Sequence, residues 1–282
     1  MPTVETNGIQ TYYERFGDGP PIVFVHGGIV DRNGWRPQID ALAEEYTVVA
    51  YDLRGHGLTG PSTRERYSIE LFADDLAALL DALDLEQPVV CGHSTGGCVA
   101  QVHASRNPDD IAGLVLADTF TPEVLSRADW VQRQLLLASI LPARLVGFQR
   151  VERAKNWLHE RFQPGAAGEY ETIETLRADG ATMSTNEFAK VIRAMVRFGD
   201  RPIDFTRIDA PTLVLYGEND LGFIRQHAAK LEAELPNPSL LEVPGAGHAA
   251  NLDNPAFVND AIREFLVSVV GYTDVTATPV IQ

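Results

Sequence analysis

The chain has 282 residues, enough to bury a large core as one α/β domain with an insertion or as two small domains. Its 39 acidic side chains outnumber 23 basic ones, and the net charge of -16 disfavours binding to nucleic acid or to an anionic membrane surface. We expect neither a secretory signal nor a membrane span, because Met1–Glu5 has no basic region and no apolar run is long enough to cross a bilayer. Two cysteines, Cys91 and Cys98, suggest neither a disulfide framework nor a metal site, so the sequence predicts a cytoplasmic protein.

The predicted elements begin with two strands within Thr3–Phe16, joined by a hairpin turn at Asn7-Gly8. Apolar runs then predict buried strands at Pro21–His26, Thr47–Tyr51, Pro88–Cys91, Leu114–Leu116, Thr212–Tyr216 and Leu240–Val243. Helical spacing of apolar residues predicts helices at Trp35–Glu45, Ile69–Leu83, Cys98–Arg106, Ile224–Leu235 and Pro255–Val270. This alternation of strands and helices indicates an α/β fold with a mostly parallel sheet and helices on both faces.

One long segment interrupts the alternation. Between Thr119 and Asp209 the sequence has no strand signal, only amphipathic stretches at Trp130–Leu141, Leu145–Phe162 and Glu187–Arg197. We therefore expect a helical lid over residues 119–209, inserted after the sixth strand, and a core formed by residues 1–118 and 210–271. The tail, residues 272–282, has no usable periodicity.

The pentapeptide Gly92-His93-Ser94-Thr95-Gly96 lies between a predicted strand and a predicted helix. A Gly-x-Ser-x-Gly sequence in that position is the signature of a nucleophile elbow, in which the serine hydroxyl projects from a tight, strained turn. Alone, so short a motif is equally well explained as a glycine-rich turn that starts a helix. The remaining parts of a catalytic site must therefore support the assignment.

A serine hydroxyl needs a base to take its proton. His248 is our candidate, because it follows the last predicted strand and its loop reaches the sheet edge where Ser94 lies. The other histidines lie in helical stretches or glycine-rich turns; His103, His159 and His227 are expected at the surface, and His26 is expected to have a structural role.

The base needs a carboxylate that orients its ring. Asp220 follows the preceding strand, and the order Ser94, Asp220, His248 is the one expected for an α/β hydrolase. Asp118, at the end of the strand after Ser94, is the competing candidate. The backbone N–H groups of Thr95 and Gly28 are the expected donors to an oxyanion, since Thr95 starts a helix and Gly28 lies in a loop after an early strand.

These motifs together resemble the α/β-hydrolase superfamily along nearly the whole chain. The resemblance rests on His26-Gly27-Gly28, Asp52–Gly57, Gly92–Gly96, Gly217–Asp220 and Gly247-His248, which occur in the family's order. It implies an eight-stranded, mostly parallel sheet flanked by helices, with a lid, and catalysis without a cofactor or a metal. A serine nucleophile separates this chain from the dehalogenases and epoxide hydrolases of the fold, which use aspartate.

The stretch Asp52–Thr119 and the run Gly247–Leu252 resemble 3-oxoadipate enol-lactonases, small carboxylesterases and cofactor-free haloperoxidases. The resemblance implies a serine hydrolase that cleaves a small or medium-sized carboxylic ester or lactone through an acyl-enzyme on Ser94. The alternatives are carbon–carbon bond hydrolysis or haloperoxidase activity on the same triad, and a hydrolase-like ligand receptor with slow turnover. The only expected partner is the small-molecule substrate; the sequence leaves the oligomeric state open.

Overall fold

The computed structural model describes residues 2–162, 164–166, 168 and 183–270. Eight strands form one sheet in the order β1-β2-β4-β3-β5-β6-β7-β8. They are β1 (Thr3–Thr6), β2 (Ile9–Phe16), β3 (Pro21–Val25), β4 (Thr47–Tyr51), β5 (Val89–His93), β6 (Gly113–Ala117), β7 (Thr212–Gly217) and β8 (Pro238–Val243). Only the pairs β1–β2 and β2–β4 are antiparallel. The predicted mostly parallel, eight-stranded sheet is confirmed; the tail, residues 272–282, lies outside the described residues.

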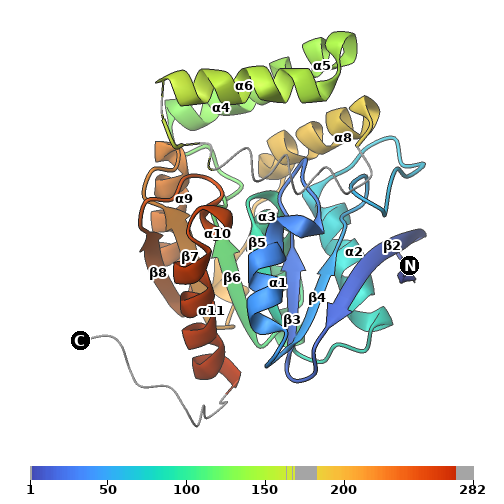
Figure 1. The fold of residues 1–282 in the computed structure, drawn as a ribbon, viewed down its shortest axis with the longest axis vertical. Helices are drawn as coiled ribbons and strands as arrows, with labels where there is room; N and C mark the ends of the chain where they lie inside the picture. Colours follow the sequence, from blue (N-terminus) through green and yellow to red (C-terminus); the bar gives the residue numbers. More distant parts are fainter. Residues whose placement is uncertain (1, 163, 167, 169–182, 271–282) are drawn as a thin grey trace.

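Helices cover both faces of this sheet (Figure 1). The core helices are α1 (Arg36–Leu42), α2 (Ile69–Ala82), α3 (Thr95–Arg106), α9 (Gly222–Glu234), α10 (Ala250–Asp253) and α11 (Pro255–Val270). Side chains of β3 alternate between the two apolar layers: Val23 and Val25 pack with α2 and α3, and Ile22 and Phe24 pack with α1 and α11. Because β3 is covered on both faces, its sequence is continuously apolar.

In the described part of the chain, four helices lie over the carboxyl edge of the sheet as a lid, drawn in green and gold at the top of Figure 1. They are α4 (Arg127–Ala138), α5 (Ile140–Val146), α6 (Phe148–Phe162) and α8 (Thr185–Val196). The lid has its own apolar cluster, in which Phe148 stacks on Phe188 at a ring distance of 5.2 Å. No described helix is long and apolar enough to cross a bilayer.

Two helix predictions need correction. The stretch Leu145–Phe162 is not one helix, because Gly147 has φ 88° and separates α5 from α6. A left-handed residue of this kind ends a helix, and glycine adopts it without steric cost. The helix after the elbow begins at Thr95 instead of Cys98, so Ser94 is the residue immediately before its first turn.

A buried ion pair connects α2 to the loop after β4. Arg54 donates to both carboxylate oxygens of Asp75, at 2.8 and 2.6 Å, and both residues are at most 3% exposed. Asp75 also accepts a hydrogen bond from the Asn7 amide at 2.7 Å. Its neighbour Asp74 instead pairs with Arg106 at 3.1 Å on the exposed surface.

These adjacent aspartates provide a matched stability test. Asp75→Ala leaves the Arg54 charge buried without a partner, so we expect a loss of about 3–5 kcal/mol in the free energy of unfolding. Asp74→Ala removes only an exposed pair and should cost less than about 1 kcal/mol. Urea unfolding of both variants measures the two losses in the free energy of unfolding. Equal losses would show that the buried pair of Arg54 and Asp75 stabilises the fold no more than the exposed pair does.

Candidate active site

Ser94 lies at the tip of a sharp turn between β5 and α3, with φ 50° and ψ -114°. A side chain at Gly92 would overlap the backbone of Gly96, and one at Gly96 would overlap the backbone of β3. The turn is therefore closed by backbone packing that only glycine permits at these two positions. Its ends are fixed by two hydrogen bonds: Ser94 N–H donates to the Ala117 carbonyl at 2.8 Å, and the Thr119 hydroxyl donates to the Ser94 carbonyl at 2.7 Å.

The structure brings Ser94, His248 and Asp220 together in one hydrogen-bonded chain. The Ser94 hydroxyl lies 3.1 Å from His248 Nε2, and His248 Nδ1 lies 3.1 Å from both carboxylate oxygens of Asp220. A nitrogen that faces two carboxylate oxygens carries the proton, so Nε2 presents its lone pair to the serine hydroxyl. Burial would lower the pKa of His248, but the Asp220 carboxylate raises it above the ordinary value of 6.5.

Asp118, the competing candidate, is fully buried and makes different contacts. Its two oxygens accept backbone N–H groups, from Gly217 at 3.0 Å and from Ala250 at 2.9 Å. Burial and the nearby Asp220 charge raise the pKa of Asp118 well above its ordinary value. The carboxylate thus joins the end of β7, just before Asp220, to the start of α10, just after His248, and among the described residues it makes no hydrogen bond to the His248 imidazole.

The loop after β3 passes directly beside the nucleophile. A Cβ placed on Gly27 would lie 3.5 Å from Ser94 Cβ, and one placed on Gly28 would lie 2.9 Å from Thr95 Oγ1. Gly28 and Thr95, the expected oxyanion donors, are therefore neighbours on two different elements. Thr95 is the first residue of α3, where the backbone N–H groups have no partner within the helix.

Two buried histidines hold this loop in place. His26 Nδ1–H donates to the Gly27 carbonyl at 2.7 Å, while His26 Nε2 accepts from Leu53 N–H at 3.0 Å. His56 Nε2 accepts from Ile29 N–H at 3.3 Å. Burial lowers the pKa of His26 to about 4 and that of His56 to about 3, so both rings are neutral and serve as structural links.

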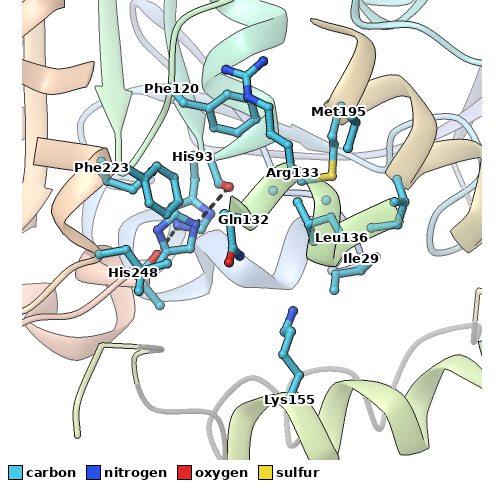
Figure 2. A pocket seen from close by; sticks show the side chains of 18 of the residues that line it. Ile29, His93, Phe120, Gln132, Arg133, Leu136, Lys155, Met195, Phe223 and His248 are labelled. Atoms are coloured by element: carbon cyan, nitrogen blue, oxygen red, sulfur yellow. Dashed lines mark hydrogen bonds between the residues drawn. The ribbon is translucent and has the colours of Figure 1, made fainter. Parts of the chain in front are cut away.

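A cavity lies between this catalytic edge and the lid, and Ser94 and His248 line it. Figure 2 shows Phe120, Leu136, Met195 and Phe223 around it, so most of its wall is apolar. The lid residues among these were not identified from the sequence, because apolar helix positions that line a cavity have the same spacing as those that fill a core.

One wall of the cavity is ionic. Lys155 points from α6 into the cavity (Figure 2), and its ammonium group lies 2.9 Å from the buried carboxylate of Glu152. The lysine charge also lowers the pKa of His248, although less than Asp220 raises it. The sequence contains no motif around Lys155 that would have singled it out.

The prediction that His103 and His227 are surface residues is wrong, since they are 1% and 0% exposed. Thr121 N–H donates to His227 Nδ1 at 3.1 Å, so the proton is on Nε2, which donates to Asp129 at 3.2 Å. Burial would raise the pKa of Asp129, but hydrogen bonds from His227 and Arg133 lower it to about 2. This network fastens the first helix of the lid to α9 of the core.

Comparison with known proteins agrees with this architecture. A non-heme chloroperoxidase of Streptomyces lividans is 32% identical over 282 residues, which cover 95% of this chain and 100% of that protein. The 3-oxoadipate enol-lactonase 2 of Acinetobacter baylyi is 28% identical, with 93% of this chain and 94% of the relative covered. The solved structure of a thermophilic esterase from Thermogutta terrifontis has a TM-score of 0.73 and 28% identity, and the match covers 95% of this chain and 97% of that chain.

A family model described as alpha/beta hydrolase fold matches residues 20–255. The matched segment contains the elbow, both candidate acids and His248. The chain therefore belongs to the alpha/beta-hydrolase family.

Proposed function

We propose that this protein is a serine hydrolase that cleaves a carboxylic ester or lactone through an acyl-enzyme on Ser94. The observation that carries the proposal is the continuous contact from the Ser94 hydroxyl to His248 Nε2 and from His248 Nδ1 to Asp220, each step at 3.1 Å. Nucleophile, base and orienting acid in that geometry are the parts that acyl transfer needs. Relatives named as an esterase and an enol-lactonase support the same reaction class.

The first half of the reaction forms the acyl-enzyme. Ser94 Oγ attacks the substrate carbonyl while His248 Nε2 takes the hydroxyl proton, and Asp220 stabilises the imidazolium that results. The carbonyl oxygen becomes an oxyanion beside the backbone N–H groups of Gly28 and Thr95. His248 then returns the proton to the alcohol oxygen as the carbon–oxygen bond breaks.

Water completes the cycle under the same base. His248 removes a proton from water, the hydroxide attacks the acyl carbonyl, and Ser94 leaves with the proton that His248 returns. In a lactone the alcohol and the acid remain on one molecule, so a single ring-opened product is released. The apolar wall formed by Phe120, Leu136 and Met195 suits an acyl chain of several carbons.

Ser94→Ala tests the nucleophile. We expect turnover of p-nitrophenyl esters to fall roughly 10³-fold or more, because only oxyanion and binding effects remain. In the native protein, kcat/KM should increase from the acetate to longer acyl esters, by up to about fourfold for each methylene buried against the apolar wall. Stopped-flow release of p-nitrophenol for esters from acetate to octanoate measures both quantities.

The same experiment separates the alternatives. A stoichiometric burst followed by almost no turnover would favour a ligand receptor that retains a competent nucleophile. Unchanged ester turnover in the Ser94→Ala variant would contradict the proposed mechanism.

The pair Asp220 and Asp118 tests the orienting acid. The base must be neutral in the free enzyme, so kcat/KM increases with pH through the pKa of His248, which Asp220 holds above 6.5. Asp220→Asn should lower kcat about 10⁴-fold. It should also move the rise of kcat/KM with pH, the acidic limb of the profile, to lower pH, because the carboxylate that raises the pKa of His248 is gone.

Asp118→Asn is the matched control. It leaves the Asp220 carboxylate beside His248 but gives up one of the two backbone hydrogen bonds that Asp118 accepts, so its loss of kcat should be smaller than that of Asp220→Asn, with a small shift of the acidic limb in the same direction. If Asp118→Asn is inactive while Asp220→Asn retains native activity, the assignment of the acid is wrong. Profiles of kcat/KM from pH 5 to 10 provide the comparison.

A further inference from the structure

Helix α6 of the lid lines the cavity on one side and is exposed on the other. Glu152, only 3% exposed, and Lys155 lie on the side that lines the cavity. Trp157, two residues after Lys155 and therefore on the opposite side of the helix, is 69% exposed, and Phe162, at the end of the helix, is 73% exposed.

Helices α4 and α5 of the lid also leave apolar side chains exposed. Trp130 and Leu135 of α4 are 53% and 59% exposed, and Leu141 and Leu145 of α5 are 66% and 76% exposed. Leu141 and Leu145 are one helical turn apart and share a face. We call these four side chains, together with Trp157 and Phe162, the outer lid surface. Apolar side chains gathered in this way on neighbouring helices mark an interaction site.

Helices α4, α5 and α6 of the lid lie in a segment whose charge is opposite to that of the rest of the chain. Residues 124–162 contain seven Lys and Arg residues but three Asp and Glu residues, in a protein of net charge -16. Among the side chains that the structure describes in this segment, every exposed charged one is an arginine, and Asp129 and Glu152 are buried. From the net charge of the whole chain we expected no role at an anionic surface. That net charge hides a difference in sign between residues 124–162, which are basic, and the rest of the chain, which is acidic.

We propose that the outer lid surface docks onto an anionic lipid surface. Exposed Trp, Leu and Phe side chains interspersed with arginines are the composition that binds the interface of a bilayer, and anionic headgroups attract each arginine. A second copy of the chain docked face to face would instead place arginines against arginines. The acidic body is repelled by the same headgroups, so the protein docks with the lid first.

This orientation has a consequence for the cavity. Helix α6 exposes Trp157 on one side and lines the cavity with Lys155 on the opposite side. Docking therefore places the covering of the cavity against the lipid surface, where amphiphilic esters concentrate. The proposal concerns binding and does not depend on which ester is cleaved.

Cosedimentation of the full chain with vesicles tests the proposal. We expect binding to vesicles of phosphatidylcholine and phosphatidylglycerol in equal parts, and much weaker binding to phosphatidylcholine alone. The double variants Trp157→Ser with Phe162→Ser, and Arg150→Glu with Arg161→Glu, should each lower the partition coefficient about tenfold or more. Hydrolysis of soluble p-nitrophenyl acetate should stay at the native level in both, because none of these four residues lines the cavity.

Two further variants, with changes outside the outer lid surface, serve as controls. Arg15→Glu with Arg207→Glu makes the same charge change at exposed positions outside helices α4, α5 and α6, and Val267→Ser removes an exposed apolar side chain of α11. Both should bind vesicles like the native chain. Native binding that does not depend on phosphatidylglycerol, or lid variants that bind as well as the controls, would overturn the proposal. A dimer in light scattering that the lid variants abolish, without vesicle binding, would assign the surface to a second copy.

Discussion

The backbone of Ser94, held at φ 50° between β5 and α3, is the constraint on which the site depends. A non-glycine residue in that region costs on the order of 1–3 kcal/mol, which the surroundings must offset. The offset comes from the parallel sheet, because Ser94 N–H extends the β5–β6 ladder, and from the close packing of Gly92 and Gly96. In this conformation the hydroxyl projects beyond the sheet edge, where loops from β3, β7 and β8 converge.

The second requirement is that those loops keep their relative positions, and buried polar groups provide this. Asp118 bonds the loop after β7 to the start of α10, and neutral His26 and His56 fix the loop that carries Gly28. Each of these groups has its hydrogen-bonding capacity used by backbone, which is how a buried polar side chain avoids a desolvation penalty. The geometry of the candidate site therefore depends on neighbours outside the chain of contacts formed by Ser94, His248 and Asp220.

Local patterns made much of this predictable. The elbow and the loops of the candidate base and acid depend on short-range features, namely glycine spacing and position after a strand, so Ser94, Asp220 and His248 could be chosen as candidates before the fold was known. The helix break at Gly147 could not be predicted in this way, because residues on both sides of it have helical periodicity. His227 looked like a surface residue because polar neighbours surround it in sequence, whereas its burial comes from Thr121 and Asp129, about a hundred residues away.

The measurement that tests the central claim most directly is covalent trapping with a fluorophosphonate, followed by mass spectrometry of the intact chain and of its peptides. Phosphonylation requires a serine activated by its base, and the tetrahedral adduct cannot be released by the route open to an acyl group. The account predicts one adduct per chain, on Ser94, with labelling greatly slowed by His248→Ala. An unmodified Ser94 in a folded protein, or labelling that is equally fast without His248, would contradict it.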